Sequence, residues 1–154
     1  MGYKFSADTI GGWENHFKRM GRWKERVFAE TENLSGNFHT ALDFVLAYFV
    51  WAHSMRDWLI NSGVPQNDLD QELRKFDQWT ICRDIANRSR HLKLTRNPRD
   101  ADWSIARELD FVSHLQGREE QRMFLVSVDK KYDVRLLVLR TNEMWEEVLV
   151  SLQK

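Results

Sequence analysis

The stretch Ile81–Leu94, with the sequence ICRDIANRSRHLKL, decides the fold, because its pattern is typical of the second half of a long helix. A helical stripe drawn from Leu69 in steps of about 100° per residue begins apolar and then becomes polar. In order, the stripe contains Leu69, Leu73, Phe76, Thr80, Arg83, Asn87, His91 and Leu94. An unpaired polar group on a packing face costs about 1–3 kcal/mol. The stretch therefore indicates either a functional site or a buried polar cluster that only fixes the helix register.

The preceding helix, expected over about 37–60, also becomes polar in its last third. Its apolar stripe consists of Phe38, Leu42, Val45 and Phe49. The continuation of this stripe reaches His53 and Arg56, with Asp57 beside them. His53 and Asp57 are four residues apart, so a carboxylate can orient an imidazole on the same helix face. We therefore expect a second polar cluster made of His53, Arg56 and Asp57.

A plain helical hairpin about residues 63–65 would hold these two clusters apart. Arg56 would then lie level with about Glu72, and Asn87 would lie level with about Ala41. At 1.5 Å of rise per residue, this offset is on the order of 20 Å. The two clusters are therefore expected to be separate, or to be joined only by a second subunit.

The whole chain, 1–154, is expected to be one domain with a mainly α fold. We expect a helical bundle with a small antiparallel β element, either a hairpin or a three-stranded meander, near the C-terminus. The expected segments are an N-terminal arm and basic helix at 1–36, a long helical hairpin at 37–95, the β element at 101–140 and a C-terminal helix at 141–154.

Within the β element, Met123–Val128 and Val134–Leu139 are expected to form strands, and Thr141 is expected to cap the last helix. Apolar residues alternate over 103–111, as in a half-buried strand. A helix through Ile105 and its apolar neighbours in 109–112 fits nearly as well, so this segment stays open between strand and helix.

Composition places the chain among ordinary globular proteins, with 42% hydrophobic and 30% charged residues. Basic and acidic residues both number 23, so net charge gives no argument for nucleic acid. The single Cys82 suits a reducing compartment. No apolar run reaches the roughly 20 residues that span a bilayer, and no secretory signal is visible. We therefore expect a cytoplasmic protein without a membrane partner.

Standard catalytic motifs are missing from the sequence, since it has no glycine-rich phosphate loop, no nucleophile elbow and no zinc-ligand spacing. We therefore expect no metal and no cofactor. Residues 83–99 contain six basic residues and one acidic residue. Residues 16–26 are also basic, which suits a solvated helix face or a surface for RNA or an acidic partner. Arginine and histidine together can bind a phosphodiester and move protons without a metal.

Two motifs resemble a group of small bacterial and phage proteins: the tripeptide RDW at 56–58 and the pattern N-x-x-R-H at 87–91. More loosely, residues 37–95 resemble the HEPN superfamily of helical nucleases. This resemblance implies a bundle of about four helices, a homodimer and metal-independent RNA cleavage at the dimer interface. In the superfamily an arginine usually precedes the histidine by four to six residues. Here Arg83 precedes His91 by eight residues and Arg88 by three, while Asn87 and His91 match at helical spacing.

The resemblance implies an RNA-binding protein or metal-independent ribonuclease of a bacterial or phage conflict system, such as toxin–antitoxin or phage defence. His91 would then be the general acid and base, Asn87 would orient it or the phosphate, and Arg83 would hold the backbone. Further RNA contacts would come from Arg88, Arg90 and Lys93. The alternative is a non-catalytic protein–protein interaction module, such as a phage-encoded inhibitor or a toxin partner. A contiguous patch of exposed tryptophans would favour this alternative.

Overall fold

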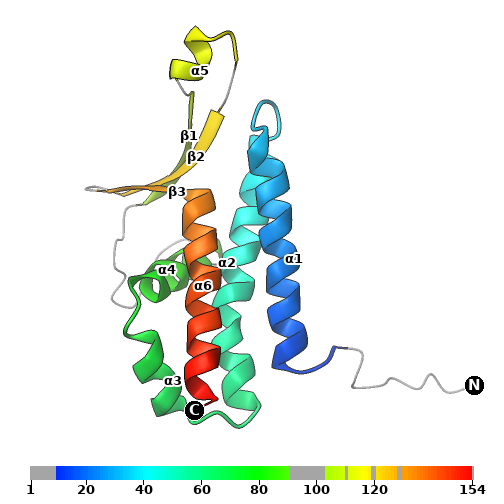
Figure 1. Ribbon diagram of the computed structural model, residues 1–154, viewed down its shortest axis with the longest axis vertical. Coiled ribbons are helices and arrows are strands. Elements are labelled where there is room, and N and C mark those ends of the chain that lie inside the picture. The colour runs from blue at the N-terminus through cyan, green and yellow to red at the C-terminus, as the bar shows by residue number, and fades with distance from the viewer. Residues whose placement is uncertain (1–9, 91–102, 110, 119–120, 128–129, 154) are drawn as a thin grey trace, which may run out of the picture.

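The computed structural model describes residues 10–90, 103–109, 111–118, 121–127 and 130–153, which form a helical bundle with a small sheet near one end (Figure 1). In this part of the chain the elements are, in order, α1 (Trp13–Glu32), α2 (Phe38–Asn61), α3 (Gln66–Leu73), α4 (Asp77–Arg90), β1 (Ser104–Leu109), α5 (Phe111–Leu115), β2 (Gln121–Val126), β3 (Lys131–Asp133) and α6 (Val134–Leu152). The predicted mainly α fold, with a small antiparallel β element and a C-terminal helix, is confirmed.

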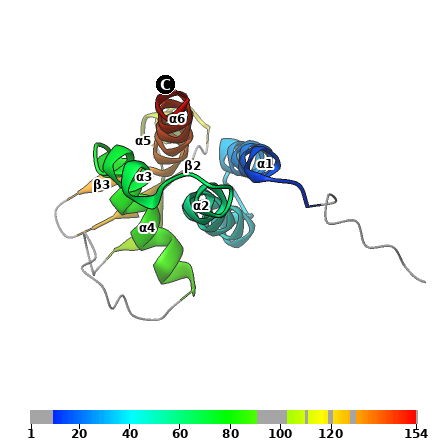
Figure 2. The same ribbon diagram turned by 90° about the horizontal axis from the view of Figure 1, so that it is seen from below.

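Helix α2 lies at the centre of the bundle. Viewed along the bundle, it has α1 on one side and α4 on the other, with α6 packed beside it (Figure 2). The fully buried residues of α2 lie along one broad stripe at helical spacing, among them Val45, Phe49 and Ala52. Tyr48 is also buried, and its hydroxyl donates a hydrogen bond of 3.0 Å to the Val138 carbonyl on α6. Burial of each large apolar side chain stabilises the fold by about 1.5–3 kcal/mol.

The turn between α2 and α3 follows the local sequence closely. Gly63 has a φ of 101°, a conformation that L side chains rarely adopt. The amide of Val64 donates to the Leu59 carbonyl at 3.1 Å, and the amide of Gly63 donates to the Ile60 carbonyl at 3.0 Å. These two bonds close the end of α2 in a Schellman arrangement, and Pro65 directly precedes α3.

The sheet contains three antiparallel strands in the order β1-β2-β3. Of the two structures left open for residues 101–113, the strand is found at Ser104–Leu109, and the short helix α5 follows it. Met123 and Leu125 of β2 are buried, while their neighbours on the strand are more exposed. The sheet therefore contributes one apolar face to the core, next to the first turns of α6.

The expected strand at Val134–Leu139 is wrong, because these residues form the first turns of α6. The Asp133 side chain caps this helix by accepting a hydrogen bond of 3.2 Å from the Leu136 amide. Thr141 is likewise not a cap. It is fully buried inside α6, and its hydroxyl donates to the Leu137 carbonyl at 2.8 Å. The C-terminal helix therefore begins at residue 134 rather than 141.

The expected long third helix is also wrong, since it is broken into α3 and α4. Residues 74–76 form a tight turn between the two helices, in which the Phe76 amide donates a hydrogen bond of 3.1 Å to the Leu73 carbonyl. Each half has its own buried face. Leu69 and Leu73 are fully buried on α3, which packs against α6, and α4 packs mainly against α2. No described helix is long and apolar enough to cross a membrane.

Candidate functional site at the junction of α2, α3 and α4

The break before α4 lets this helix cross α2 at its middle. Cys82 is fully buried there, and its thiol donates to the Phe49 carbonyl with an Sγ···O distance of 3.8 Å. Burial raises the pKa of this thiol well above its usual range, so Cys82 is a packing residue and not a nucleophile. The contact places the C-terminal half of α4 next to the polar last third of α2.

Arg90 of α4 connects the two predicted polar clusters within one chain. Its Nη2 atom lies 3.2 Å from His53 Nδ1 and donates a second hydrogen bond of 3.2 Å to Asn87 Oδ1. Its Nε atom donates to the Ala86 carbonyl, also at 3.2 Å. The expected separation of about 20 Å is therefore wrong. That estimate assumed one straight helix after residue 67. The separation was also the geometric reason to expect a dimer, and this reason is lost because the helix is broken.

Trp79 forms a wall of the site. Its ring stacks on His53, with the centroids 5.2 Å apart and the planes 16° apart. Its ring also meets Trp145 of α6, with the centroids 5.8 Å apart and the planes 82° apart. Trp145 is fully buried, so the imidazole of His53 is held by an aromatic pair anchored in the core.

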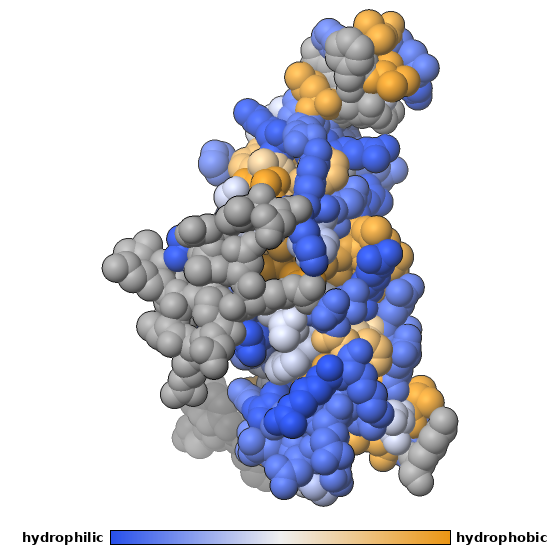
Figure 3. Space-filling view, turned by 90° about the vertical axis from the view of Figure 1, so that its left-hand side faces the viewer, coloured by the Kyte–Doolittle hydropathy of each residue, from blue (hydrophilic) through white to orange (hydrophobic). Residues whose placement is uncertain are grey.

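Next to His53 is an open pocket of about 420 Å³. Its lining includes His53 and Arg56 from α2, Asp70 and Arg74 from α3 and the turn after it, and Trp79 and Arg83 from α4. In the space-filling view, hydrophilic residues cover much of the end near α3, and hydrophobic residues appear near α5 at the opposite end and along the middle of the face (Figure 3).

Arg56 is fixed in place by carboxylates. Its Nε and Nη2 atoms donate to the two oxygens of Asp70 at 2.7 and 3.0 Å, and Asp57 lies 3.5 Å from Nη1. The hydrogen bonds with Asp70 raise the pKa of Arg56, and Arg56 in turn lowers the pKa of the Asp70 carboxyl. Arg56 therefore presents a fixed guanidinium edge at the pocket.

Positive and negative charges balance at the pocket. Arg83 bonds to one oxygen of Asp84 at 3.0 and 3.1 Å, and Arg74 is exposed at the rim. The lining contains three arginines and the two carboxylates of Asp70 and Asp77. Beside this lining, Arg90 adds one positive charge, while Asp57 and Asp84, which contact Arg56 and Arg83, add two negative charges. The pocket therefore offers several guanidinium groups to an anion without a net positive charge.

His53 is neutral at pH 7, because its pKa is lowered from 6.5 to about 4. Burial is the largest cause, and the positive charge of Arg90 is the next. Arginine can only donate, so Nδ1 of His53 is the acceptor in their hydrogen bond. The proton of the neutral ring is then on Nε2. His53 therefore offers an N–H donor rather than a free basic nitrogen.

We expect histidine NMR titration to give a pKa of about 4 for His53. The Arg90→Gln variant should raise this pKa, because Arg90 lowers it, and the Asp57→Asn variant should lower it further. Since the unfolded value is near 6.5, the unfolded chain binds this proton first as pH falls. The stabilising contribution is therefore complete above pH 6.5 and is lost between pH 6.5 and about 4. A wild-type His53 that titrates near pH 6.5 would contradict the described contacts.

Of the residues that the sequence indicated, His53, Arg56 and Arg83 line the pocket, and Asn87 lies beside it. Asp57 is largely exposed next to Arg56, and Arg88 is half-buried on α4. His91 and Lys93 lie outside the described residues. The sequence did not indicate Asp70, Arg74, Phe76, Asp77, Trp79 or Thr80 as site residues. The apolar stripe passed through Phe76 and Thr80, but nothing in the pattern brought Trp79 to His53.

Within the described residues, no group of three histidine, cysteine or acidic side chains is placed to hold a metal ion. Comparison of the chain with protein-family models, with curated proteins and with solved structures gives no match. The resemblance to the HEPN superfamily therefore rests on the motifs at 56–58 and 87–91 alone.

Proposed function

We propose that the chain is a HEPN-like RNA-binding protein of a bacterial or phage conflict system, acting in the cytoplasm. In this proposal, the pocket between α2, α3 and α4 holds a phosphate of the RNA backbone. The observation that carries the proposal is the Arg90 hydrogen bond to His53, which brings both polar clusters to one place in a single chain. Guanidinium groups and a neutral imidazole N–H are suitable donors for phosphate oxygens.

The shape of the site supports binding of a polyanion more than a purely structural role. The donors of Arg56, Arg83 and Arg90 do have internal partners. A polar cluster that only fixes helix register would, however, enclose no pocket. Here, a pocket of about 420 Å³ adjoins His53, Arg56 and Arg83, and the exposed Arg74 stands at its rim. This volume lies within the range of pockets that bind small ligands or single groups of a larger one.

The alternative function, a non-catalytic protein-interaction module, is less well supported by the aromatic residues. All seven tryptophans are described, and each is buried or only partly exposed. Trp51 and Trp58 lie against His16, and the other five pack against the core or form part of it. There is consequently no exposed tryptophan patch that a partner protein could use as an anchor.

Direct measurement of RNA affinity tests the proposal. We expect wild-type protein to bind single-stranded RNA with an affinity that falls steeply as salt rises, because phosphate contacts release counterions. The Arg88→Glu/Arg90→Glu variant should bind RNA far more weakly, and its salt slope should be smaller by about 1 for each phosphate that the variant no longer neutralises. The matched control is Lys130→Glu/Arg140→Glu, which makes the same charge change at exposed positions outside the pocket.

Two results would refute the proposal. One is an affinity that stays flat between about 50 and 200 mM salt, the range over which phosphate contacts weaken most. The other is an equal loss of affinity in both double variants, which would show that only total charge matters. Competition by inorganic phosphate, together with a phosphate-induced rise in the pKa of His53, would place the bound anion at this pocket.

A homodimer and RNA cleavage by His91 remain part of this proposal. They derive from the resemblance, in which Asn87 would orient His91 or the phosphate. The contact between Asn87 and Arg90 supports a shared role for these residues, because it fixes the Asn87 amide next to His53.

A further inference from the structure

The balanced charges of the pocket between α2, α3 and α4 suit a ligand with hydrogen-bond donors as well as acceptors. A phosphodiester only accepts hydrogen bonds, and carboxylates repel it. The lining nevertheless places the carboxylates of Asp70 and Asp77 among its arginines. A nucleobase has ring and carbonyl acceptors, and adenine, guanine and cytosine also have an amino donor. The lining is therefore better matched to a base together with its phosphate than to a phosphate alone.

An aromatic ring in this lining is available to stack on a base. Phe76 lies in the turn between α3 and α4, is half-buried and lines the pocket. The described ring contacts of the lining involve Trp79, which lies against His53 and Trp145, and not Phe76. Since unpaired RNA bases are commonly stacked on aromatic side chains, Phe76 provides a suitable surface.

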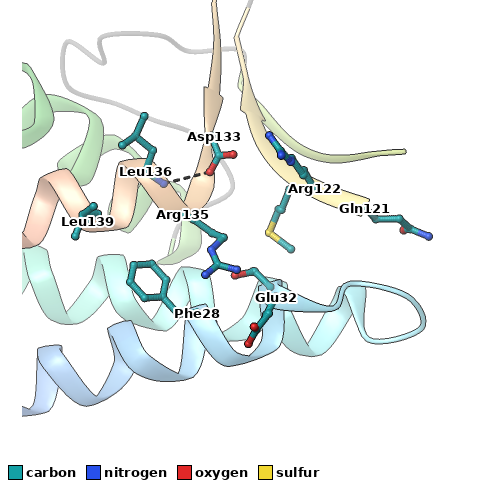
Figure 4. Close-up of a pocket in the computed structure, with 10 residues that line it drawn as sticks. Phe28, Glu32, Gln121, Arg122, Asp133, Arg135, Leu136 and Leu139 are labelled. Carbon is teal, nitrogen blue, oxygen red and sulfur yellow. Dashed lines mark hydrogen bonds between the residues drawn. The ribbon is translucent and has the colours of Figure 1, made fainter. Parts of the chain in front are cut away.

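A second groove in the described part of the chain lacks this combination. It lies between the last turns of α1, β2 and the first turns of α6, with a volume of about 600 Å³ (Figure 4). Its charges balance too, with Arg122 and Arg135 against Glu32 and Asp133. However, the Arg135 guanidinium lies over the ring of Phe28, 5.1 Å from its centroid. Phe28 therefore already has a stacking partner, which makes it a control for Phe76.

Asp77 gives the first pocket a means to distinguish bases. It is exposed in the first turn of α4, directly after Phe76. Asp70 accepts from Arg56 with both oxygens, at 2.7 and 3.0 Å, so its carboxylate is held by that guanidinium. A carboxylate can accept several N–H bonds, and one recurrent partner is the amino group of cytosine. Uracil has a carbonyl oxygen at the same position, which a carboxylate repels.

We propose, building on the RNA binding proposed for this pocket, that it takes one unpaired base of the RNA and prefers a base with an amino group to uracil. The base stacks on Phe76, its amino group donates to the Asp77 carboxylate, and its phosphate lies toward the exposed Arg74. These three residues come from one short stretch of chain, the turn before α4 and its first residue. A base inside a duplex cannot enter, because its faces and its amino group already have partners.

Oligo(C) and oligo(U) dodecamers test the preference, because they have the same length and charge. We expect the wild-type chain to bind oligo(C) about tenfold more tightly than oligo(U) at one salt concentration. The Asp77→Asn variant should lose this difference, since an amide can pair with either base. The matched control is Asp68→Asn, which makes the same change in the first turn of α3 and should keep the difference.

The Phe76→Leu variant tests stacking, because leucine keeps an apolar side chain but removes the ring. It should bind both dodecamers about tenfold more weakly than wild type, whereas Phe28→Leu should bind them as wild type does. An abasic oligomer of the same length should bind wild type and Phe76→Leu equally. Salt-dependent RNA binding without base preference, and unchanged by Phe76→Leu, would overturn base recognition but leave the proposed RNA binding intact. Binding to neither dodecamer would refute both.

NMR titration of the wild-type chain gives a test that requires no variant to fold. Cytidine monophosphate should shift the amide signals of residues 74–77 and should saturate them at a lower concentration than uridine monophosphate does. Equal saturation by the two nucleotides, or no shift of these amides by cytidine monophosphate, would overturn the base preference.

Discussion

Replacement of Trp145 by alanine is expected to lower the free energy of unfolding by about 3–5 kcal/mol. Trp145 is fully buried on α6 and meets Trp79 edge-on at 5.8 Å. The substitution removes a large apolar side chain and leaves a cavity between α6 and α4, which pack directly on each other. Urea unfolding at pH 7, followed by circular dichroism, measures the difference between the variant and wild type.

The control for this substitution is Val150→Ala on the same helix, where the side chain is 56% exposed. It should change the free energy of unfolding by no more than about 0.5 kcal/mol. A decrease below about 1 kcal/mol in Trp145→Ala would show that α6 does not pack on α4 as described. Trp79 also supports His53 by stacking, so the same cavity should disturb the pKa of His53 in a variant that still folds.

The parts of the fold that could be predicted from sequence are those encoded locally. The apolar stripe of α2 places Val45 and Phe49 inward, and both residues are buried. The glycine and proline at residues 63–65 predicted the turn after α2, and Gly63 indeed takes a positive φ. In such segments the local pattern and the tertiary packing favour the same structure.

The errors lie where local patterns allow two structures. Residues 134–139 form a short apolar run, which periodicity alone cannot assign to a strand or a buried helix. In the structure these residues form a helix, which is capped by Asp133 and is packed against α2 at the Tyr48–Val138 hydrogen bond. The break at residues 74–76 contains no proline or glycine. On its two sides, α3, with Leu73 buried, packs against α6, whereas α4, with Ile85 buried, packs mainly against α2.

The candidate site shows the same division between local and tertiary information. Helical spacing identified His53, Arg56, Arg83 and Asn87 as polar groups on packing faces, and they do gather in one region. The contact of Trp79 with His53 depends on the angle at which α4 crosses α2. That angle follows from the break before α4, which the sequence pattern did not reveal.

Replacement of His91 by alanine is expected to reduce RNA cleavage about 10²–10⁴-fold, if His91 is the general acid and base of the proposed ribonuclease. Neutral His53 is unsuited to this role, because its Nδ1 atom accepts a hydrogen bond from Arg90 and Nε2 is protonated. The assay incubates pure protein with total RNA in EDTA, so that metal-dependent contaminants are inactive. The control is His39→Ala, which removes an exposed histidine at the start of α2.

The pattern of activity among the variants decides which histidine acts. Cleavage that is abolished in His53→Ala but kept in His91→Ala would refute the assignment, and loss of folding in His91→Ala would support a structural role instead. Light scattering on the same samples gives the mass of the active species. Because Arg90 already joins His53 to Asn87 within one chain, a monomer can contain both polar clusters. A clean monomer that cleaves RNA would therefore refute a site shared across a dimer, but it would agree with a site formed by one chain. A wild-type protein that binds RNA without cleaving it would show that the function is binding and not cleavage.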